Sequence, residues 1–350
     1  LLERNVAELK GDVQAIKTPA DKAHNAIEKV KAPLQLPGKI KSKVKRVKSI
    51  AKGLDSLAQL VSIVPGPIGA GAKALHQALI PLLGKRGVPG VFDQVISALG
   101  KVEKAVKPVI TKLNQVEKPI DAARKDLAGL LVRIGQLEAV AVSVRAHYGE
   151  PPPPEVQACL GKLNEALALV VKPMAAARKR AAGALAELAK GLDRLREALK
   201  PLNDIARDVE KTLAQLDSKA VQQMSAVLNK IAKAVKPILD LANWVIKQTI
   251  ERLLKALGIK LDAIEKFFRN LVNALNPFKG LQKRIDRIAS DLAKKVAGLP
   301  AVAGLLRALD ELAGLERRLD REVEKALRGA CKAVLMPDVK ATAGRRAKAG

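Results

Sequence analysis

The chain has 350 residues, of which 48% are hydrophobic and only 2% aromatic, and its 63 Lys and Arg against 35 Asp and Glu give a net charge of +28. A bias toward small aliphatic and charged residues is typical of long helices and coiled coils, and it argues against ordinary globular domains with aromatic-rich cores. The basic excess predicts attraction to polyanions such as anionic lipid or nucleic acid.

Residues 1–55 are expected to form amphipathic helices, because apolar residues recur there every three or four positions. Pro19 predicts a kink or a restart, and Pro33, Pro37 and Gly38 predict the end of the first helix. The next helix contains the densest group of cations in the chain. We call this group the basic patch and predict that it contacts an anionic partner; it consists of Lys39, Lys41, Lys43, Lys45, Arg46, Lys48 and Lys52.

Residues 56–89 are predicted to form an apolar hairpin that contains no Asp or Glu. A Pro65-Gly66-Pro67 turn separates two apolar arms, and each arm is shorter than the ~20 residues that a bilayer-spanning helix needs. One interpretation is a helical hairpin buried in protein, and the other is a tip that contacts a membrane. The predicted membrane contacts are Leu60, Val61, Ile63, Val64, Ile68, Leu79, Ile80 and Leu82.

Residues 90–150 are predicted to form a long heptad helix. Apolar residues at a mean step of 3.5 define one stripe, here called the seam, which must be covered by other helices. The seam keeps its phase across Pro108 and Pro119, so we expect a bent but continuous helix. Its stripe is wider than a strict coiled-coil seam, which favours a bundle of three or more helices. Representative seam residues are Val106, Leu113, Ile120, Leu127 and Ile134.

After a polyproline linker at residues 151–155, residues 156–298 are predicted to contain one or more long helical segments. At Pro201 and Pro237 the sequence leaves a kink and a reversal of the chain equally open. Ser218 is expected to cap a helix after a break.

The chain is predicted to end with an amphipathic helix at residues 299–336. The basic segment 337–350 lacks apolar residues to bury, so we expect it to be disordered.

The two cysteines and the few aromatic residues are expected to act as packing groups. Cys159 and Cys331 have a spacing that fits no metal or redox motif, and we expect two free thiols. Trp244, Phe267 and Phe268 are expected to anchor the seam, and the alternative is a role in binding a partner or at a bilayer interface.

No nucleotide-binding, zinc-protease or redox motif occurs, so we predict no catalytic residues, no cofactor, no metal and no enzymatic activity. The three histidines, His24, His76 and His147, lie far apart in the sequence without acidic or cysteine neighbours. We interpret them as surface or groove residues.

The predicted fold class is all-α, an elongated bundle or coiled coil of long, proline-kinked amphipathic helices. The first functional hypothesis is a structural or scaffolding protein that associates with itself or with other helical subunits through its heptad seams. Such a protein would attach electrostatically to an anionic partner or surface. No small-molecule substrate is expected, and the compartment is left undecided.

The alternative hypothesis is a membrane-active or lipid-binding protein that uses residues 39–84. Long bundle helices with an apolar hairpin inserted between them resemble the α-helical pore-forming toxins of the cytolysin A type. Proline-punctuated amphipathic helices are similar to exchangeable apolipoproteins. A lesser alternative is nucleic-acid binding, which the basic excess would support through phosphate contacts. Such binding would be non-specific, because the sequence has no reader motif and little aromatic interleaving for base stacking.

Overall fold

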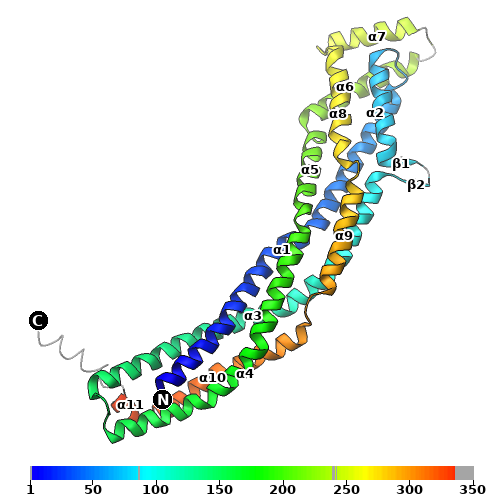
Figure 1. Ribbon diagram of the computed structural model, residues 1–350. Coiled ribbons are helices and arrows are strands. Elements are labelled where there is room, and N and C mark those ends of the chain that lie inside the picture. The colour runs from blue at the N-terminus through cyan, green and yellow to red at the C-terminus, as the bar shows by residue number, and fades with distance from the viewer. Residues whose placement is uncertain (1, 86, 239–240, 242, 336–350) are drawn as a thin grey trace, which may run out of the picture. The chain divides into compact units, whose positions relative to one another are not determined.

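The computed structural model describes residues 2–85, 87–238, 241 and 243–335, and this part of the chain is almost entirely α-helical (Figure 1). The all-α prediction with long helices is therefore confirmed. The longest helices are α1 (Leu2–Val61), α3 (Val91–Tyr148) and α4 (Pro154–Leu199). The other α-helices are α2 (Pro67–Leu83), α5 (Pro201–Leu216), α6 (Lys219–Val235), α7 (Asn243–Ala256), α8 (Leu261–Leu275), α9 (Leu281–Ala297), α10 (Val302–Ala326) and α11 (Ala330–Leu335).

Two 3-10 turns and one short β-pair complete the described elements. The turns are η1 (Lys236–Ile238) and η2 (Asn276–Phe278). The strands β1 (Gly84–Lys85) and β2 (Val88–Pro89) pair antiparallel, a feature that the helical pattern did not predict. Gly84 and Gly87 both have positive φ, which glycine adopts without strain, so they permit this tight reversal.

The chain divides into two compact units, each assembled from segments far apart in the sequence. Unit 1 contains residues 1–30, 109–194 and 298–350, and unit 2 contains residues 31–108 and 195–297. Unit 1 therefore includes α10, α11 and parts of α1, α3 and α4. Unit 2 includes α2 and α5–α9 with the remaining parts of the long helices. The predicted tail at residues 337–350, with residue 336, lies outside the described residues.

Helix α3 matches the predicted heptad helix closely. It is continuous over 58 residues and passes through Pro108 and Pro119 without a break. All five representative seam residues are at most 4% exposed. Other helices of the same chain cover this seam, so its burial requires no second copy.

The prediction that Pro33, Pro37 and Gly38 end the first helix is wrong, because α1 continues through them and through Pro19 for 60 residues. An interior proline removes one backbone hydrogen bond and costs about 3 kcal/mol. Buried aliphatic residues flank these positions on the same face, and each contributes roughly 1.5–3 kcal/mol. Burial therefore outweighs the local preference to stop.

The structure decides between the two alternatives at Pro201 in favour of a kink. Lys200 has αR dihedral angles, and its N–H donates to the Arg196 carbonyl, so α5 follows α4 without a reversal. At Pro237 the helix does end, because α6 stops at Val235 and a 3-10 turn follows. Ser218 caps α6 as predicted, since its hydroxyl accepts from the Val221 N–H at 3.3 Å.

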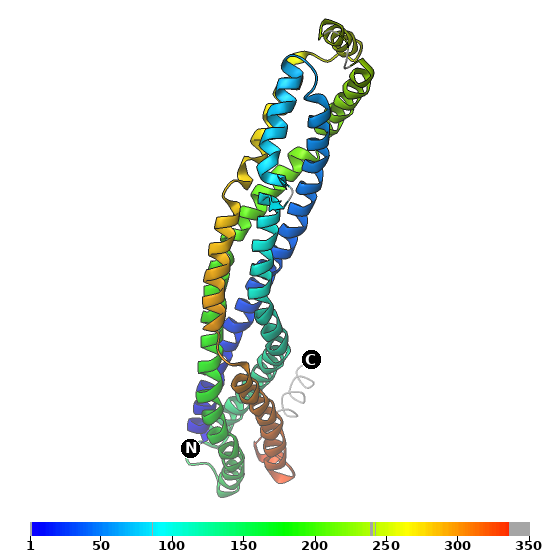
Figure 2. The same cartoon turned by 90° about the vertical axis from the view of Figure 1, so that its right-hand side faces the viewer.

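Unit 2 is packed by aliphatic seams, by one contact between two phenylalanine rings and by a close approach of a glycine to a third phenylalanine ring. Phe92 and Phe278, both fully buried, meet edge to face with ring centroids 4.9 Å apart. Helix α2 packs along α8 (Figure 2), and a Cβ at Gly71 would lie only 2.8 Å from the Phe268 ring. Glycine at this position therefore allows the two helices to approach closely.

Unit 1 contains a covalent link that corrects the prediction of free thiols. Cys159 of α4 and Cys331 of α11 form a disulfide, with their Cα atoms 5.3 Å apart. The bond joins residues separated by 172 positions and fastens the C-terminal helices to α4. Sequence spacing contains no signal for it, because the two cysteines become neighbours only when α11 folds against α4.

An ion pair between a buried aspartate and a partly exposed arginine also fastens α1 to α4 in unit 1. The Asp12 carboxylate is 3% exposed and accepts a hydrogen bond from Nη1 of Arg178 at 2.6 Å. Its second oxygen, Oδ2, has no hydrogen-bond partner among the described residues. Removing the arginine would leave a buried carboxylate uncompensated, so this pair is a sensitive point of the α1–α4 contact.

Candidate anionic-surface site

The basic patch on α1 is largely neutralised inside unit 2. Four of its seven cations form ion pairs with acids of other segments: Lys41 with Glu103, Lys43 with Glu210, Arg46 with Asp217 and Lys48 with Asp93. Glu103 and Asp93 belong to α3, Glu210 belongs to α5, and Asp217 directly follows α5. These four cations therefore help to hold the helices together.

Three cations of the patch remain outside ion pairs with the described residues: Lys39, Lys45 and Lys52, and all three are exposed. Lys45 and Lys52 are seven residues apart and share one face of α1. The absence of acids from residues 39–54 suggested a patch of seven free charges. The local sequence does not reveal that acidic residues of α3, of α5 and directly after α5 pair with four of these cations.

Most of the predicted membrane contacts are buried in protein. Val61, Val64, Ile68, Leu79 and Leu82 are at most 4% exposed, and Ile80 is half-buried. In this conformation the five buried residues are unavailable to lipid. Only Leu60 and Ile63 face outward, at 52% and 51% exposure, beside the Pro65-Gly66-Pro67 turn.

A second group of cations, which local density did not single out, lies on α6, α7 and α8. Residues 219–269 contain ten Lys and Arg against four Asp and Glu. All ten are exposed, and within the described part of the chain only Lys247 forms an ion pair, with Glu251 at 3.9 Å. An acid-free stretch from residue 218 to 239 was the signal that could have revealed this group.

Trp244 is an exposed surface residue, which corrects its assignment to the seam. It is the second residue of α7 and is 64% exposed. The buried stripe of α7 consists of Ile246, Ile250 and Leu254, so the tryptophan points to a different face. The Phe pair behaves partly as predicted, since Phe268 is buried and Phe267 is half-buried.

Two histidines have acidic partners that the sequence order did not suggest. Nδ1 of His24 lies 2.7 Å from Asp121, and Nδ1 of His76 lies 2.7 Å from Asp55. Each pair joins two different helices.

No group of three metal-ligating side chains occurs within the residues that the structure describes.

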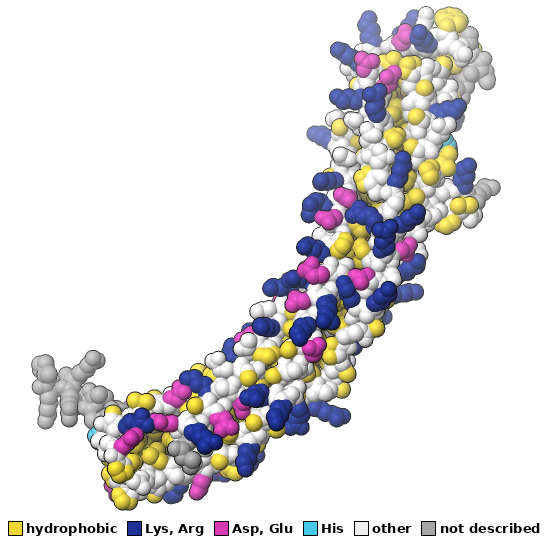
Figure 3. Space-filling view, viewed as in Figure 1, with side chains coloured by type: hydrophobic (Ala, Val, Ile, Leu, Met, Phe, Trp, Pro, Cys, Tyr) yellow, Lys and Arg dark blue, Asp and Glu magenta, His cyan; other side chains and the backbone are white. Residues whose placement is uncertain are grey.

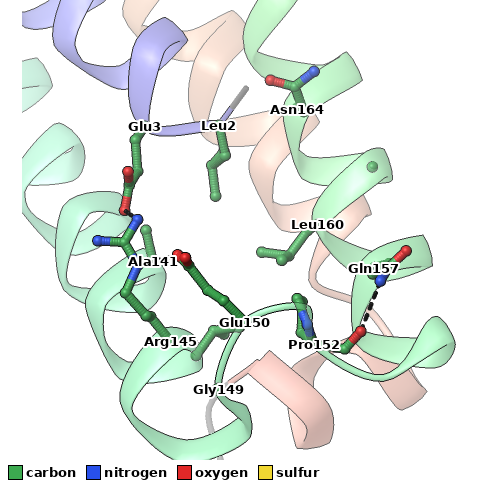
Figure 4. A pocket seen from close by; sticks show the side chains of 12 residues that line it. Leu2, Glu3, Ala141, Arg145, Gly149, Glu150, Pro152, Gln157, Leu160 and Asn164 are labelled. Atoms are coloured by element: carbon green, nitrogen blue, oxygen red, sulfur yellow. Dashed lines mark hydrogen bonds and ion pairs between the residues drawn. The ribbon is translucent and has the colours of Figure 1, made fainter.

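A hollow of about 510 Å³ lies in unit 1, where the chain turns from α3 into α4. Figure 4 shows the side chains that line it. Arg145 lies between Glu3 and Glu150, at 2.7 Å and 2.6 Å from their carboxylate oxygens. The hydrogen bond to Glu3, followed by the charges of Glu150 and Glu3, raises the pKa of Arg145. The described residues of the lining include no Ser, Cys or His, so they offer no nucleophile with an adjacent base.

By length and composition alone, α3 could cross a membrane, and it is the one helix of the described part that meets this criterion. One third of its most apolar stretch is buried within the chain. Core helices of soluble proteins meet the same criterion, so it does not distinguish a span from a bundle helix.

Neither a scan against protein-family models nor a search of curated proteins finds a match for this chain.

Proposed function

We propose that this chain is a non-enzymatic scaffolding protein that attaches electrostatically to an anionic surface, and that unit 2 is the attaching part. The observation that supports this most is the distribution of charge. Unit 2 contains 34 Lys and Arg against 14 Asp and Glu, a net charge of +20, whereas unit 1 accounts for +8. A field of this strength concentrates anionic partners near unit 2, and salt weakens it.

Two groups of exposed cations on unit 2 are available for this attachment. One is the free part of the basic patch, Lys39, Lys45 and Lys52, and the other is the set on α6–α8. Figure 3 shows many Lys and Arg side chains over unit 2 without an adjacent acid. Because these cations are dispersed along helices and are mainly lysines, they suit a surface of many anionic groups better than one bidentate ligand.

Charge reversal tests the proposal with a matched control. The variant K39E/K45E/K52E changes unit 2, and K22E/K125E/K179E makes the same change at exposed lysines of unit 1. Binding to anionic vesicles and to polyphosphate is measured at low and high salt. We expect roughly a tenfold or greater loss for the unit 2 variant and a much smaller loss for the control. Equal losses, or no binding by the unaltered chain at low salt, would contradict the proposal.

Self-association is a second candidate function, and a stripe on α3 within unit 1 favours it. Residues at 4-3-4-3-4 spacing along α3 are all exposed, and they are Ala128, Val132, Gly135, Ala139, Val142 and Ala146. This is a heptad stripe that the chain itself leaves uncovered. If it joins copies of the chain, V132E/V142E shifts sedimentation toward the monomer. An unaltered chain that is monomeric at every accessible concentration would exclude this candidate.

A further inference from the structure

Half of the ten large apolar side chains that are exposed in the described part of the chain belong to one end of unit 2: Leu60, Ile63, Leu241, Trp244 and Leu261. They come from the end of α1, the turn before α2, the residues around the start of α7, and the first residue of α8. Both views place the α1–α2 turn, α7 and the beginning of α8 at the same end of this unit (Figures 1 and 2).

Such clustering is uncommon, because single exposed apolar residues are normally scattered over a protein surface. This chain has one tryptophan, and that residue is 64% exposed, with Leu241 three positions earlier 51% exposed. Elsewhere in unit 2, large apolar side chains are mostly buried in aliphatic seams, so the exposure of these five is an exception within the unit. Their exposure at one place therefore indicates a surface that is covered by another partner.

Cations surround the apolar group on α6 and α7. On α7, Lys255 lies eleven residues after Trp244 and shares its side of the helix, and Arg252, eight residues after Trp244, is turned by about 80° from it. Lys247 is exposed one turn away, and it pairs at 3.9 Å with Glu251, the one acid of α7, which lies seven residues after Trp244 on the same side of the helix. Lys230 and Lys233 are exposed on α6, which packs against α7. Figure 3 shows hydrophobic side chains among Lys and Arg at this end.

We propose that this end of unit 2 docks onto an anionic lipid bilayer, with Trp244 and Leu241 inserted at the headgroup boundary and the α6–α7 cations paired with lipid phosphates. This inference rests on the proposed attachment of unit 2 to an anionic surface, and it names that surface. A free polyanion would use the cations and leave the apolar side chains in water. A bilayer interface uses both, because tryptophan favours the headgroup level and Lys and Arg favour anionic lipid.

The docking is peripheral. Helix α7 has 14 residues, fewer than the ~20 that a bilayer span requires. Its buried stripe of Ile246, Ile250 and Leu254 remains packed in the protein, while Trp244 lies on the outward side. We therefore expect a shallow contact through side chains at one end of the unit, with no transfer of a helix across the membrane.

The single tryptophan makes the test direct, because all intrinsic tryptophan fluorescence of the full chain comes from Trp244. The chain is mixed with phosphatidylcholine vesicles that contain phosphatidylglycerol, with phosphatidylcholine vesicles alone, and with polyphosphate. We expect a blue shift and quenching by brominated acyl chains with the anionic vesicles only. A chain that floats with these vesicles while Trp244 stays unshifted and unquenched overturns the docking site but leaves electrostatic attachment intact. A chain that binds polyphosphate and no vesicles also overturns the docking site.

Variants separate the apolar contribution from the ionic one. Replacing Trp244 by Ala should weaken vesicle binding roughly tenfold and Trp244→Phe should restore most of it, whereas polyphosphate binding is unchanged. The pair R252E/K255E should weaken binding about fivefold per position at low salt. Leu169→Ala, an exposed leucine on α4 in unit 1, is the control and should have no effect. Equal effects of Trp244→Ala and Leu169→Ala would refute the proposal, and helical circular dichroism verifies that each variant folds.

Discussion

Loss of the Cys159–Cys331 disulfide is expected to destabilise the chain more than any single surface change. The bond closes a loop of 172 positions. In the chain-entropy treatment, a loop of this length removes about 17 cal/mol/K from the unfolded state, or about 5 kcal/mol at 25 °C. Strain and residual structure reduce such values in practice, so 5 kcal/mol is the upper limit. For cooperative unfolding of the whole chain, this corresponds to a decrease in Tm on the order of 7 °C.

The assay compares the Tm of the chain, folded under oxidising conditions, with and without a thiol reductant. The double variant C159A/C331A is the control, because the reductant should not change its Tm. Comparing reduced protein with the variant separates the bond from the small packing loss at the two buried side chains. Two titratable thiols in the unreduced, unfolded protein, or a Tm that the reductant leaves unchanged, would refute the reasoning.

Three further predictions concern unit 1. Leu127→Ala removes a fully buried seam residue of α3 and should lower the free energy of unfolding by about 2–5 kcal/mol in urea titrations; a loss below about 0.5 kcal/mol would mean that the seam is not packed. Arg178→Gln removes the ionic partner of the buried Asp12 carboxylate and should cost about 3 kcal/mol in the same titration, and an unchanged free energy of unfolding would contradict this. Burial, followed by the charge of Asp126, raises the pKa of Glu316, so Glu316 favours the folded state only when protonated and this contribution is lost as pH rises. Glu316→Gln should therefore raise Tm at neutral pH and lose that advantage below the ordinary glutamate pKa of 4.5, and an advantage that persists in acid would contradict this.

Much of the secondary structure could be predicted because it depends on local pattern. The α3 seam residues such as Ile120 recur with helical spacing over many turns, and so many repeats outweigh the effect of Pro108 and Pro119. The same principle applies to α1, where the buried aliphatic residues on either side of Pro33 and Pro37 keep the helix continuous. The start of α6 was predictable because a serine cap acts on backbone groups only three residues away.

The candidate site was less predictable, because it depends on which helices become neighbours. Lys43 belongs to an acid-free stretch of sequence and yet pairs with Glu210, 167 positions away. Trp244 is a large apolar residue of the kind that anchors a seam, but the buried stripe of α7 begins two residues later, at Ile246. In both cases the local sequence identified the chemical character of the residue and left its partner undetermined.

The sequence alone determined that the chain is helical, where its apolar stripes run and that it carries a large excess of basic residues, because helical periodicity and charge are properties of the residues themselves and of their near neighbours along the chain. The tertiary structure decided which cations remain free, which apolar residues stay exposed, and that two cysteines 172 positions apart are joined. The physical reason is that heptad stripes are nearly interchangeable: each specifies that a partner helix must cover it, and only the packed units select which helix that is.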